Sequence, residues 1–439
     1  MHDIPGGLCT SWDRKGYRID GCMHFLMGIN PESMFHSTWS EIGAFEGKEF
    51  VYHDYIMQIE NSEGKKLTMY CDADKLEAHL LELSSRDSEV IGELTAAVRR
   101  FKDIRSASGD ESLLKYDKVK MGDFVQRFRD PFLREAFLAF SPKEYTVFAL
   151  IFQLAIYNSR DACWPIGGSL EFARGIERRY LELGGEILYK SKVEEILVSN
   201  DRATGIKLSD GSIHTADFVV SATDGYSTIF RMLKGQFADD EIKALYESGK
   251  VSGTSVQVSL GVDCDMSRYP YCSNIILEKP VHIGGVDITR LLMKHYCFDK
   301  TLSAPGKSVV TALINTEYEY WEELYRNYGN YAVEKKRIQD WFVSLFESKF
   351  SEAKGKIEVA DVATPMTYLR YTQVWRGAYC GWKSPAQKIP NVLPGLSGFY
   401  MAGQWTQATG GLPTAALTGK GSIIRICRDD GKEFGSSVR

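Results

Sequence analysis

The sequence predicts an α/β fold. Residues 399–402 form a short apolar run that predicts a buried strand, and a helix is predicted from Pro413 to residue 427. Residues 217–224 contain a second apolar strand, which ends in small residues and follows a hairpin with Asp210 and Gly211 at its turn. Buried strands that lead into helices are typical of an α/β sheet.

The turn between the strand at 399–402 and the helix at Pro413 is the most informative segment. It contains Gly403 and then a polar loop that ends in Gly410 and Gly411. Paired glycines let backbone N–H groups approach a ligand closely. Pro413 suits a first helical turn, which has no use for its missing N–H. Because the N-terminus of a helix offers free donors and the positive end of its dipole, we expect an electron-rich ligand here.

Three further segments carry related patterns in a fixed order. They are Gly6-Gly7 with the stretch RKGYRIDG at 14–21, the glycine pair, helix, strand and hairpin over 165–211, and the TP, RYT and GAYCG motifs within 364–381. Together with the C-terminal turn, these segments resemble the phytoene desaturase and carotenoid isomerase-like FAD oxidoreductases of the amine oxidase-like flavoprotein superfamily. Four segments in order over nearly the whole chain are far more specific than one glycine motif.

The resemblance implies an FAD-binding Rossmann-like domain of the glutathione reductase type and an interleaved α+β substrate domain. In such proteins the last strand ends at the ribityl chain, and the following helix points its N-terminus at the pyrimidine side of the flavin ring. The cofactor-binding residues implied here are Gly6, Gly7, Val193 (through its backbone), Gly403, Gln404, Gly410, Gly411, Leu412 and Pro413.

Two details of the last segment concern how the cofactor is held. Much of the family carries an acid where this chain has Gln404, and an amide bonds ribityl hydroxyls less strongly than a charged acceptor does. Residues 405–411 contain no cysteine, which excludes a thioether link in this loop and predicts non-covalent FAD.

One element of the family pattern is missing. No strand in this chain is followed by Gly-x-Gly-x-x-Gly and a helix, the unit that receives the pyrophosphate. Counting back from Gly6, the ribose-binding acidic residue falls before Met1. We therefore expect the first βα unit to be absent, through a start assigned too late or a truncation, and expect this chain to bind FAD poorly or not at all.

The implied domain organisation is interleaved. The FAD-binding domain comprises residues 1–75, 159–225 and 386–439, with a helical substrate-domain insert at 76–158 and the main substrate domain at 226–385. Within the second insert we predict strands at 255–261 and 307–314 and an amphipathic helix at 331–350.

Composition bounds the class of protein. With 439 residues, 44% hydrophobic and 25% charged, the chain is an ordinary globular protein of two or three domains. A net charge of −5 gives no electrostatic case for nucleic acid. The nine cysteines are scattered, and neither they nor the histidines have metal-ligand spacing, so no metal site is predicted. Free thiols fit a reducing cytoplasm. The sequence does not specify an oligomeric state.

The apolar run at 145–157 raises the question of whether this segment spans or contacts a membrane. It is shorter than the roughly 20 residues that span a bilayer. We favour a buried helix, with a helix that lines an apolar substrate tunnel or rests on a membrane surface as the functional alternative, so that peripheral membrane contact stays open.

The function implied is an FAD-dependent oxidoreductase that transfers hydride to or from flavin on an apolar unsaturated substrate, by desaturation, isomerisation or saturation. The flavin supplies the redox chemistry, and no catalytic residue is assigned. We interpret His24 as a satisfied structural histidine, while Trp375, Tyr379 and Trp382 could flank the flavin or belong to the core. Two alternatives remain: an amine oxidase-like flavoenzyme on a small amine, and a truncated, non-catalytic fragment without FAD.

Overall fold

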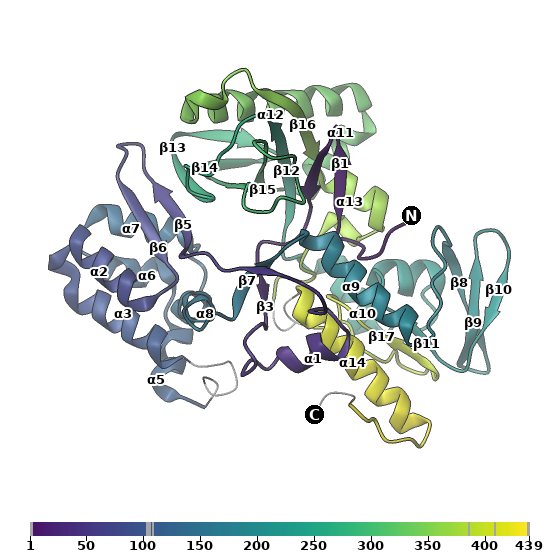
Figure 1. Ribbon diagram of the computed structural model, residues 1–439. Coiled ribbons are helices and arrows are strands. Elements are labelled where there is room, and N and C mark those ends of the chain that lie inside the picture. Colours follow the sequence, from purple (N-terminus) through teal and green to yellow (C-terminus); the bar gives the residue numbers. More distant parts are fainter. Residues whose placement is uncertain (1–2, 102–106, 108, 385–386, 408–409, 437–439) are drawn as a thin grey trace.

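The protein has three packed units, a helical lobe, a large mixed sheet and a unit of small sheets with two long helices (Figure 1). The computed structural model describes residues 3–101, 107, 109–384, 387–407 and 410–436. The chain passes repeatedly between the units, so segments far apart in sequence meet where the units join.

The large sheet has seven strands in the order β16-β12-β15-β14-β13-β5-β6. Its strands are β5 (Tyr55–Glu60), β6 (Lys66–Tyr70), β12 (Thr254–Val262), β13 (Cys272–Ile283), β14 (Val286–His295), β15 (Ser308–Thr316) and β16 (Ile357–Ala363). The helices beside it are α11 (Tyr318–Arg326), α12 (Tyr328–Lys349) and α13 (Pro365–Thr372). Phe342 and Phe346 of α12 share a buried cluster with Val258 of β12, so α12 covers one face of the sheet. The strands predicted at 255–261 and 307–314 and the helix predicted at 331–350 are confirmed.

The helical lobe surrounds a core of its own. Its helices are α2 (Ala73–Leu83), α3 (Ser88–Arg100), α5 (Glu111–Leu114), α6 (Met121–Phe124), α7 (Pro131–Phe140) and α8 (Val147–Asn158). The apolar run at 145–157 becomes α8, whose Leu150, Ile151 and Leu154 are buried, as the sequence predicts. Within the described residues, none of the helices combines the length and apolarity that crossing a membrane requires.

The third unit contains the strand and helix of the C-terminal turn. In the part of the chain that the structure describes, its parallel sheet has two strands, β11 (Val219–Ser221) and β17 (Phe399–Met401). The long helices α9 (Gly168–Glu182) and α14 (Leu412–Asp429) lie near them (Figure 1). The remaining elements are β1 (Ser11–Arg14), β2 (Tyr17–Asp20), β3 (Leu26–Met27), α1 (His36–Glu41), β4 (Phe50–Val51), β7 (Ala162–Pro165), β8 (Val193–Ser199), β9 (Arg202–Leu208), β10 (Ile213–Thr215) and α10 (Asp240–Ser248).

The prediction of a strand followed by a hairpin with Asp210 and Gly211 at its turn is confirmed. β8, β9 and β10 form a three-stranded antiparallel sheet, and Gly211 turns the chain between β9 and β10 with a φ of +90°. The first strand begins only at Val193, because Lys190 adopts a left-handed φ of +57° that interrupts an extended chain.

Two strands that the predicted division assigns to the FAD-binding domain, β5 and β6, belong to the large sheet instead. β5 and β6 fall within 1–75, yet β5 pairs in parallel with β13 through Ser273 and Gln58, at the edge of the large sheet. Burial of Ile59 and Leu67 in the core of the helical lobe fixes this placement, since both side chains are fully buried there. The sequence does not show this pairing, because an edge strand can add to any sheet with a free partner.

The buried carboxylate of Asp20 joins the units. Its oxygens accept hydrogen bonds from the backbone N–H of Ser169 (2.6 Å), from the Ser169 hydroxyl (2.7 Å) and from the N–H groups of Cys22 (3.2 Å) and Met23 (3.0 Å). Ser169 lies in the first turn of α9, so Asp20 supplies an acceptor that this helix N-terminus lacks. The Asp20 carbonyl accepts a 2.7 Å bond from the Gln257 side chain of β12. Burial raises the pKa of Asp20, and the hydrogen bonds from Ser169 oppose that rise.

Asp20→Asn is expected to lower the free energy of unfolding by about 3 kcal/mol, because either orientation of the amide places its NH₂ against backbone N–H donors. A urea titration measures this loss. The control is Asp13→Asn, in which a 65% exposed carboxylate loses only a surface ion pair with Arg18 and should cost under about 1 kcal/mol. Equal losses in the two variants would contradict the role assigned to Asp20.

Candidate functional site

The turn from β17 to α14 has the geometry predicted from the sequence. The β17 residues Phe399–Met401 are buried, and the chain then turns at Gly403 with a φ of +102°. The Gly403 N–H donates a 2.8 Å bond to the hydroxyl of Thr418 on α14. Gly411 precedes the first residue of α14 with a φ of +116°, and Pro413 stands in the first turn. Ala408 and Thr409 of this loop lie outside the described residues.

The space around each glycine of the turn shows whether the glycine is needed for protein packing or leaves room for a ligand. A Cβ at Gly410 would come within 2.4 Å of the Cys380 carbonyl oxygen, so this glycine is required for protein packing. Among the described residues other than its chain neighbours, a Cβ at Gly411 would meet no atom closer than 4.0 Å, and a Cβ at Gly403 none closer than 3.8 Å. Gly403 and Gly411 therefore combine left-handed backbone with open space, which is the arrangement that close approach to a ligand needs.

Of the two N-terminal glycines, Gly6 is also required for packing, whereas Gly7 leaves open space. A Cβ at Gly6 would come within 2.0 Å of the Cys9 carbonyl oxygen, whereas Gly7, with a φ of +61°, has no atom within 4 Å of that position among the described residues. The adjacent Leu8 packs on the buried cluster that contains Met401 and Trp405. The structure thus brings the N-terminal glycines and the C-terminal turn to one side of the molecule.

Val193 and Gln404 lie near this region with different environments. Val193 is the first residue of β8, and Lys190 just before it forms a 3.2 Å ion pair with Asp3 of the N-terminal segment. The amide of Gln404 donates a 3.4 Å bond to the Ala378 carbonyl. This bond holds the segment around residue 378 against the turn. Contact of either residue with a cofactor stays a prediction.

The tryptophans after α13 pack close to Trp405. The ring centroids of Trp382 and Trp405 lie 5.3 Å apart, and those of Trp375 and Trp382 lie 5.4 Å apart. Trp382 is 1% exposed. Trp382 is thus a core residue, while Trp375 is half-buried at the edge of the same cluster and Tyr379 donates its hydroxyl to the Asn315 side chain at 3.3 Å. Contact of these residues with a flavin stays a prediction.

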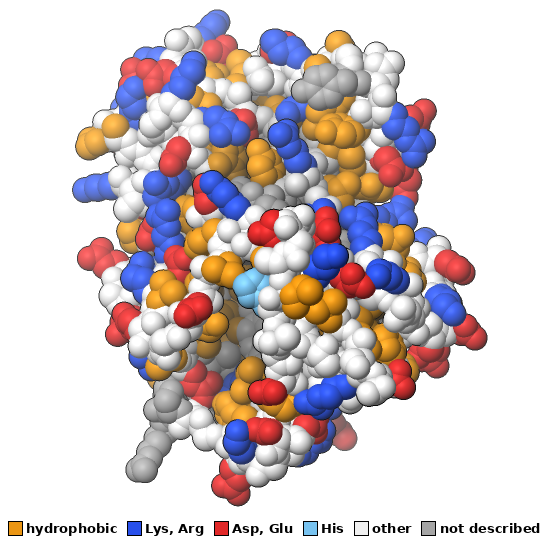
Figure 2. Space-filling model, turned by 90° about the vertical axis from the view of Figure 1, so that its right-hand side faces the viewer, with side chains coloured by type: hydrophobic (Ala, Val, Ile, Leu, Met, Phe, Trp, Pro, Cys, Tyr) orange, Lys and Arg blue, Asp and Glu red, His pale blue; other side chains and the backbone are white. Residues whose placement is uncertain are grey.

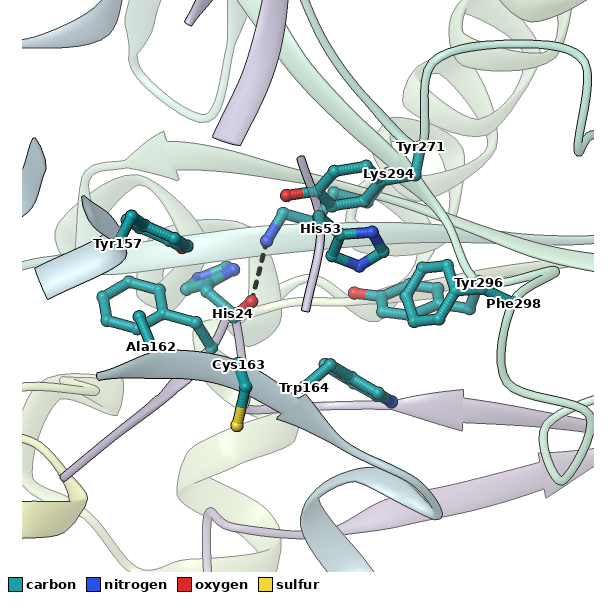
Figure 3. A pocket seen from close by; sticks show the side chains of 11 residues that line it. His24, His53, Tyr157, Ala162, Cys163, Trp164, Tyr271, Lys294, Tyr296 and Phe298 are labelled. Carbon is teal, nitrogen blue, oxygen red and sulfur yellow. Dashed lines mark hydrogen bonds between the residues drawn. The ribbon is translucent and has the colours of Figure 1, made fainter. Parts of the chain in front are cut away.

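A narrow pocket lies where the three units meet (Figure 3). It is lined mainly by aromatic side chains that come from β7, α8, the large sheet and the segment after Asp20. The lining residues are His24, Phe25, His53, Tyr157, Ala162, Cys163, Trp164, Tyr271, Lys294, Tyr296 and Phe298. Figure 2 shows one face of the molecule on which hydrophobic side chains gather near the middle while acidic and basic ones are interspersed around them.

The pocket adjoins the C-terminal turn. Trp164 and Tyr296 line the pocket and also belong to one buried cluster, against which Leu412 and Ala416 of α14 pack. The Trp164 indole donates a 2.8 Å bond to the buried carboxylate of Asp299, which also accepts the Gly167 N–H at 2.9 Å. The pocket wall is therefore fixed to the turn that begins α9.

Burial suppresses charge on most ionisable groups of the pocket. It lowers the pKa of the His53 imidazole to about 4, and the pKa of the more exposed His24 is also lowered. Burial raises the pKa of Tyr157 and of Cys163. At pH 7 these groups are neutral, and Lys294 is the charged residue of the lining.

The interpretation of His24 as a satisfied structural histidine stays a prediction, because His24 is exposed and water can reach its ring. Its imidazole lines the pocket and makes no hydrogen bond within the described residues, while its backbone carbonyl accepts a 3.1 Å bond from Lys294 Nζ. Several lining residues were not identified from the sequence. Tyr296 and Phe298 lie beyond the end of β14 at His295, so no strand alternation links them to Lys294 in the sequence.

The chain belongs to the flavin containing amine oxidoreductase family, whose model matches residues 2–422. Membership implies a flavin cofactor. The residues of the turn fit such a group, because Gly403 and Gly411 leave open space and α14 presents the N-terminus of a helix. In the part of the chain described, no cluster of three or more His, Cys, Asp or Glu side chains is arranged to hold a metal ion.

Known relatives include enzymes named for carotenoids and retinoids. The chain is 23% identical over 286 residues to the chloroplastic prolycopene isomerase of Daucus carota, a match that covers 63% of this chain and 46% of that protein. It is 24% identical over 483 residues to a lycopene-forming phytoene desaturase of Paracoccus sp., covering 97% and 91%. It is 21% identical over 512 residues to rat all-trans-retinol 13,14-reductase, covering 100% and 83%. The chain thus spans about half the length of the plant isomerases it matches.

Solved structures share the fold. An oxidoreductase of Methanosarcina mazei superposes with a TM-score of 0.60 at 18% identity, covering 96% of this chain and 92% of that one. A double mutant of putrescine oxidase superposes with a TM-score of 0.59 at 11% identity, covering 97% and 92%. The predicted relation to amine oxidase-like flavoproteins is confirmed by the family match and these structures.

Gly411→Val is expected to weaken FAD binding at least about tenfold, a loss of about 1.4 kcal/mol, because its Cβ and methyl groups would fill the open space of the turn. The measurement is a titration with FAD. The control is Gly431→Val beyond the other end of α14, which also has a left-handed φ (+69°) and open surroundings and so carries similar strain. Cys427→Ala is a second, unstrained control. If FAD affinity falls equally in Gly411→Val and Gly431→Val, Gly411 does not contact the cofactor.

His53→Phe is expected to flatten the pH dependence of stability between pH 6.5 and pH 4. The folded-state pKa of His53 is lowered to about 4 from an ordinary 6.5, so as the pH falls through this window the unfolded chain takes up a proton that the folded protein does not, and stability is lost. The phenylalanine keeps the ring stack on Tyr271 but does not titrate. The variant should retain about 1–2 kcal/mol more of its pH 7 stability at pH 4.5, measured by urea unfolding.

The control for the His53 experiment is His214→Phe, because His214 is exposed on β10. Identical stability losses in wild type and His53→Phe would show that the folded protein protonates His53 as readily as the unfolded chain does.

Proposed function

We propose that this protein is an FAD-dependent oxidoreductase that transfers hydride between flavin and a C–H or C=C site of a predominantly apolar, unsaturated substrate. The observation that carries the proposal is the junction of an open, glycine-lined turn at a helix N-terminus with an aromatic pocket, both packed on the cluster that contains Trp164. The relatives named for carotenoids and retinoids support an unsaturated substrate.

The residues of the turn would hold the cofactor. Gly403 and Gly411 admit the flavin to the backbone, and the N-terminus of α14 at Leu412 and Pro413 supplies donors to the pyrimidine side. Gly7 and the start of β8 at Val193 would lie along the adenosine half. When bound, FAD supplies the redox chemistry as acceptor or donor of hydride. It is held without a covalent bond in this proposal.

The pocket residues would bind the substrate and exclude water. His53 and Tyr271 stack with ring centroids 3.6 Å apart and planes inclined by 11°, and Phe298 meets His53 edge-on at 4.6 Å. Across the pocket, Phe25 and Tyr157 lie 5.4 Å apart. The open space between these walls is narrow, about 10 Å³, so the aromatic side chains must move apart to admit a conjugated substrate. Flat aromatic walls suit such a substrate, whose burial would be driven by the hydrophobic effect.

The pocket disfavours the alternative of a small amine. An alkylammonium ion would approach Lys294 without a carboxylate among the lining residues to attract it. Within the amine oxidase-like superfamily, the charge of the pocket therefore supports an uncharged or anionic substrate over a cationic one.

The test combines cofactor release with anaerobic reduction. Purified protein reconstituted with FAD should release all its yellow colour into the supernatant on acid precipitation. Under anaerobic conditions, prolycopene, phytoene or all-trans-retinol should change the flavin absorbance, directly or after prior flavin reduction, while putrescine should not. Gly411→Val is the matched control for signal that does not depend on bound flavin.

The outcomes separate the alternatives. Flavin that stays in the pellet would contradict non-covalent binding, and reduction by putrescine alone would favour the amine oxidase-like function. Failure to bind FAD under any condition would favour the non-catalytic fragment. Near-stoichiometric FAD binding would overturn the expectation of weak binding and require that another segment hold the pyrophosphate.

A further inference from the structure

Lys294 is a cation without an ionic partner in an otherwise uncharged pocket. Its Nζ donates one 3.1 Å hydrogen bond, to the carbonyl oxygen of His24, and within the described residues no carboxylate oxygen lies inside 4.0 Å of it. Figure 3 shows its side chain reaching from β14 toward His24, with Tyr157 and His53 on either side. An ammonium group has three donors, so at least two remain for a ligand.

The groups that face Lys294 do not balance its charge. His24 and His53 are kept neutral by burial, and the Tyr157 and Tyr271 hydroxyls stay protonated because burial raises the pKa of both. Burial lowers the pKa of Lys294, and the Asp20 carboxylate opposes that shift without forming an ion pair with it. Because Lys294 is half-buried and has no carboxylate in contact, a ligand that brings a negative charge would be favoured beside it.

A second polar atom in the pocket also lacks a partner. The His53 Nε2 atom is buried and has no hydrogen-bond partner within the described residues, although the His53 ring is held firmly between Tyr271 and Phe298. Buried polar atoms are nearly always satisfied in native proteins. Lys294 Nζ, which has donors left for a ligand, and the unpartnered His53 Nε2 line the same aromatic pocket, which indicates a ligand that is not a pure hydrocarbon.

We propose that this pocket binds a flat, conjugated molecule that ends in a carboxylate, with Lys294 Nζ as the group that binds the carboxylate. The inference rests on the proposed function in taking this pocket as the substrate site, and it narrows the substrate from any apolar polyene to one with an anionic end. Aromatic walls contact the conjugated chain, and the Lys294 ammonium forms a charge-assisted hydrogen bond that a hydrocarbon cannot make.

The experiment compares two probes with the same conjugated skeleton, all-trans-retinoic acid and the hydrocarbon axerophthene. Binding to the full chain is measured at pH 7.5 by quenching of tryptophan fluorescence, since Trp164 lines the pocket. The acid is expected to bind at least about tenfold more tightly than the hydrocarbon. Lys294→Met should abolish this preference by weakening the acid alone, and Lys294→Arg should retain part of it.

The matched control is Lys300→Met, which removes an exposed lysine from the turn after β14 and should leave both affinities unchanged. Urea unfolding checks that Lys294→Met is folded, which is expected because the substitution removes an unpaired half-buried charge. Equal affinity for the two probes, binding of neither, or a preference for the acid that survives in Lys294→Met would overturn the proposal.

Failure of this binding proposal can be told apart from failure of the proposed oxidoreductase function. Tryptophan quenching reports binding without any flavin reduction. If the acid binds through Lys294 while no polyene changes the flavin absorbance, the binding proposal stands and the oxidoreductase proposal fails. If hydrocarbon polyenes change the flavin absorbance while Lys294→Met leaves the affinity for the acid unchanged, the oxidoreductase proposal stands and the binding proposal fails.

Discussion

The hydrogen-bonded carboxylate of Asp20 is the interaction on which the rest of the site depends. It accepts the N–H and hydroxyl of Ser169 at the start of α9 and the N–H groups of Cys22 and Met23 in its own turn. A carboxylate buried in this way is stable only when its lone pairs are satisfied, and here each oxygen has at least two donors. The position of His24 and Phe25, which line the pocket, follows directly from this turn.

Other bonds attach the large sheet to the same place. Gln257 of β12 donates to the Asp20 carbonyl, and Asp299, after β14, accepts the Trp164 indole and the Gly167 N–H. The pocket therefore lies at a junction of three separately packed units, where ligand sites commonly occur. Movement of any one unit would alter the spacing between Lys294 on β14 and the residues of the Asp20 turn.

The electrostatics of the pocket follow from the same packing. Burial withdraws water from histidines, tyrosines and cysteines alike, and each responds by favouring its neutral form. Lys294 differs because it stays charged. The ordinary pKa of lysine is so high that a lowered pKa still leaves the ammonium protonated at pH 7. A pocket that is aromatic along its walls and cationic at one point distinguishes ligands by the charge at one end.

The sequence by itself determined the strand, glycine turn and helix around Gly403 and Gly411, because chain direction, left-handed φ and a proline in the first turn are local properties. It also determined β12, β15 and α8 through their apolar runs and α12 through its amphipathic pattern. Only the tertiary structure decided that β5 and β6 join the large sheet, since strand pairing is non-local. It likewise decided that Gly6 and Gly410 serve packing while Gly7 and Gly411 face open space. The pocket around Lys294 was out of reach of sequence reasoning because its walls come from residues 24 to 298, and their approach depends on bonds such as those of Asp20 and Asp299 rather than on any local pattern.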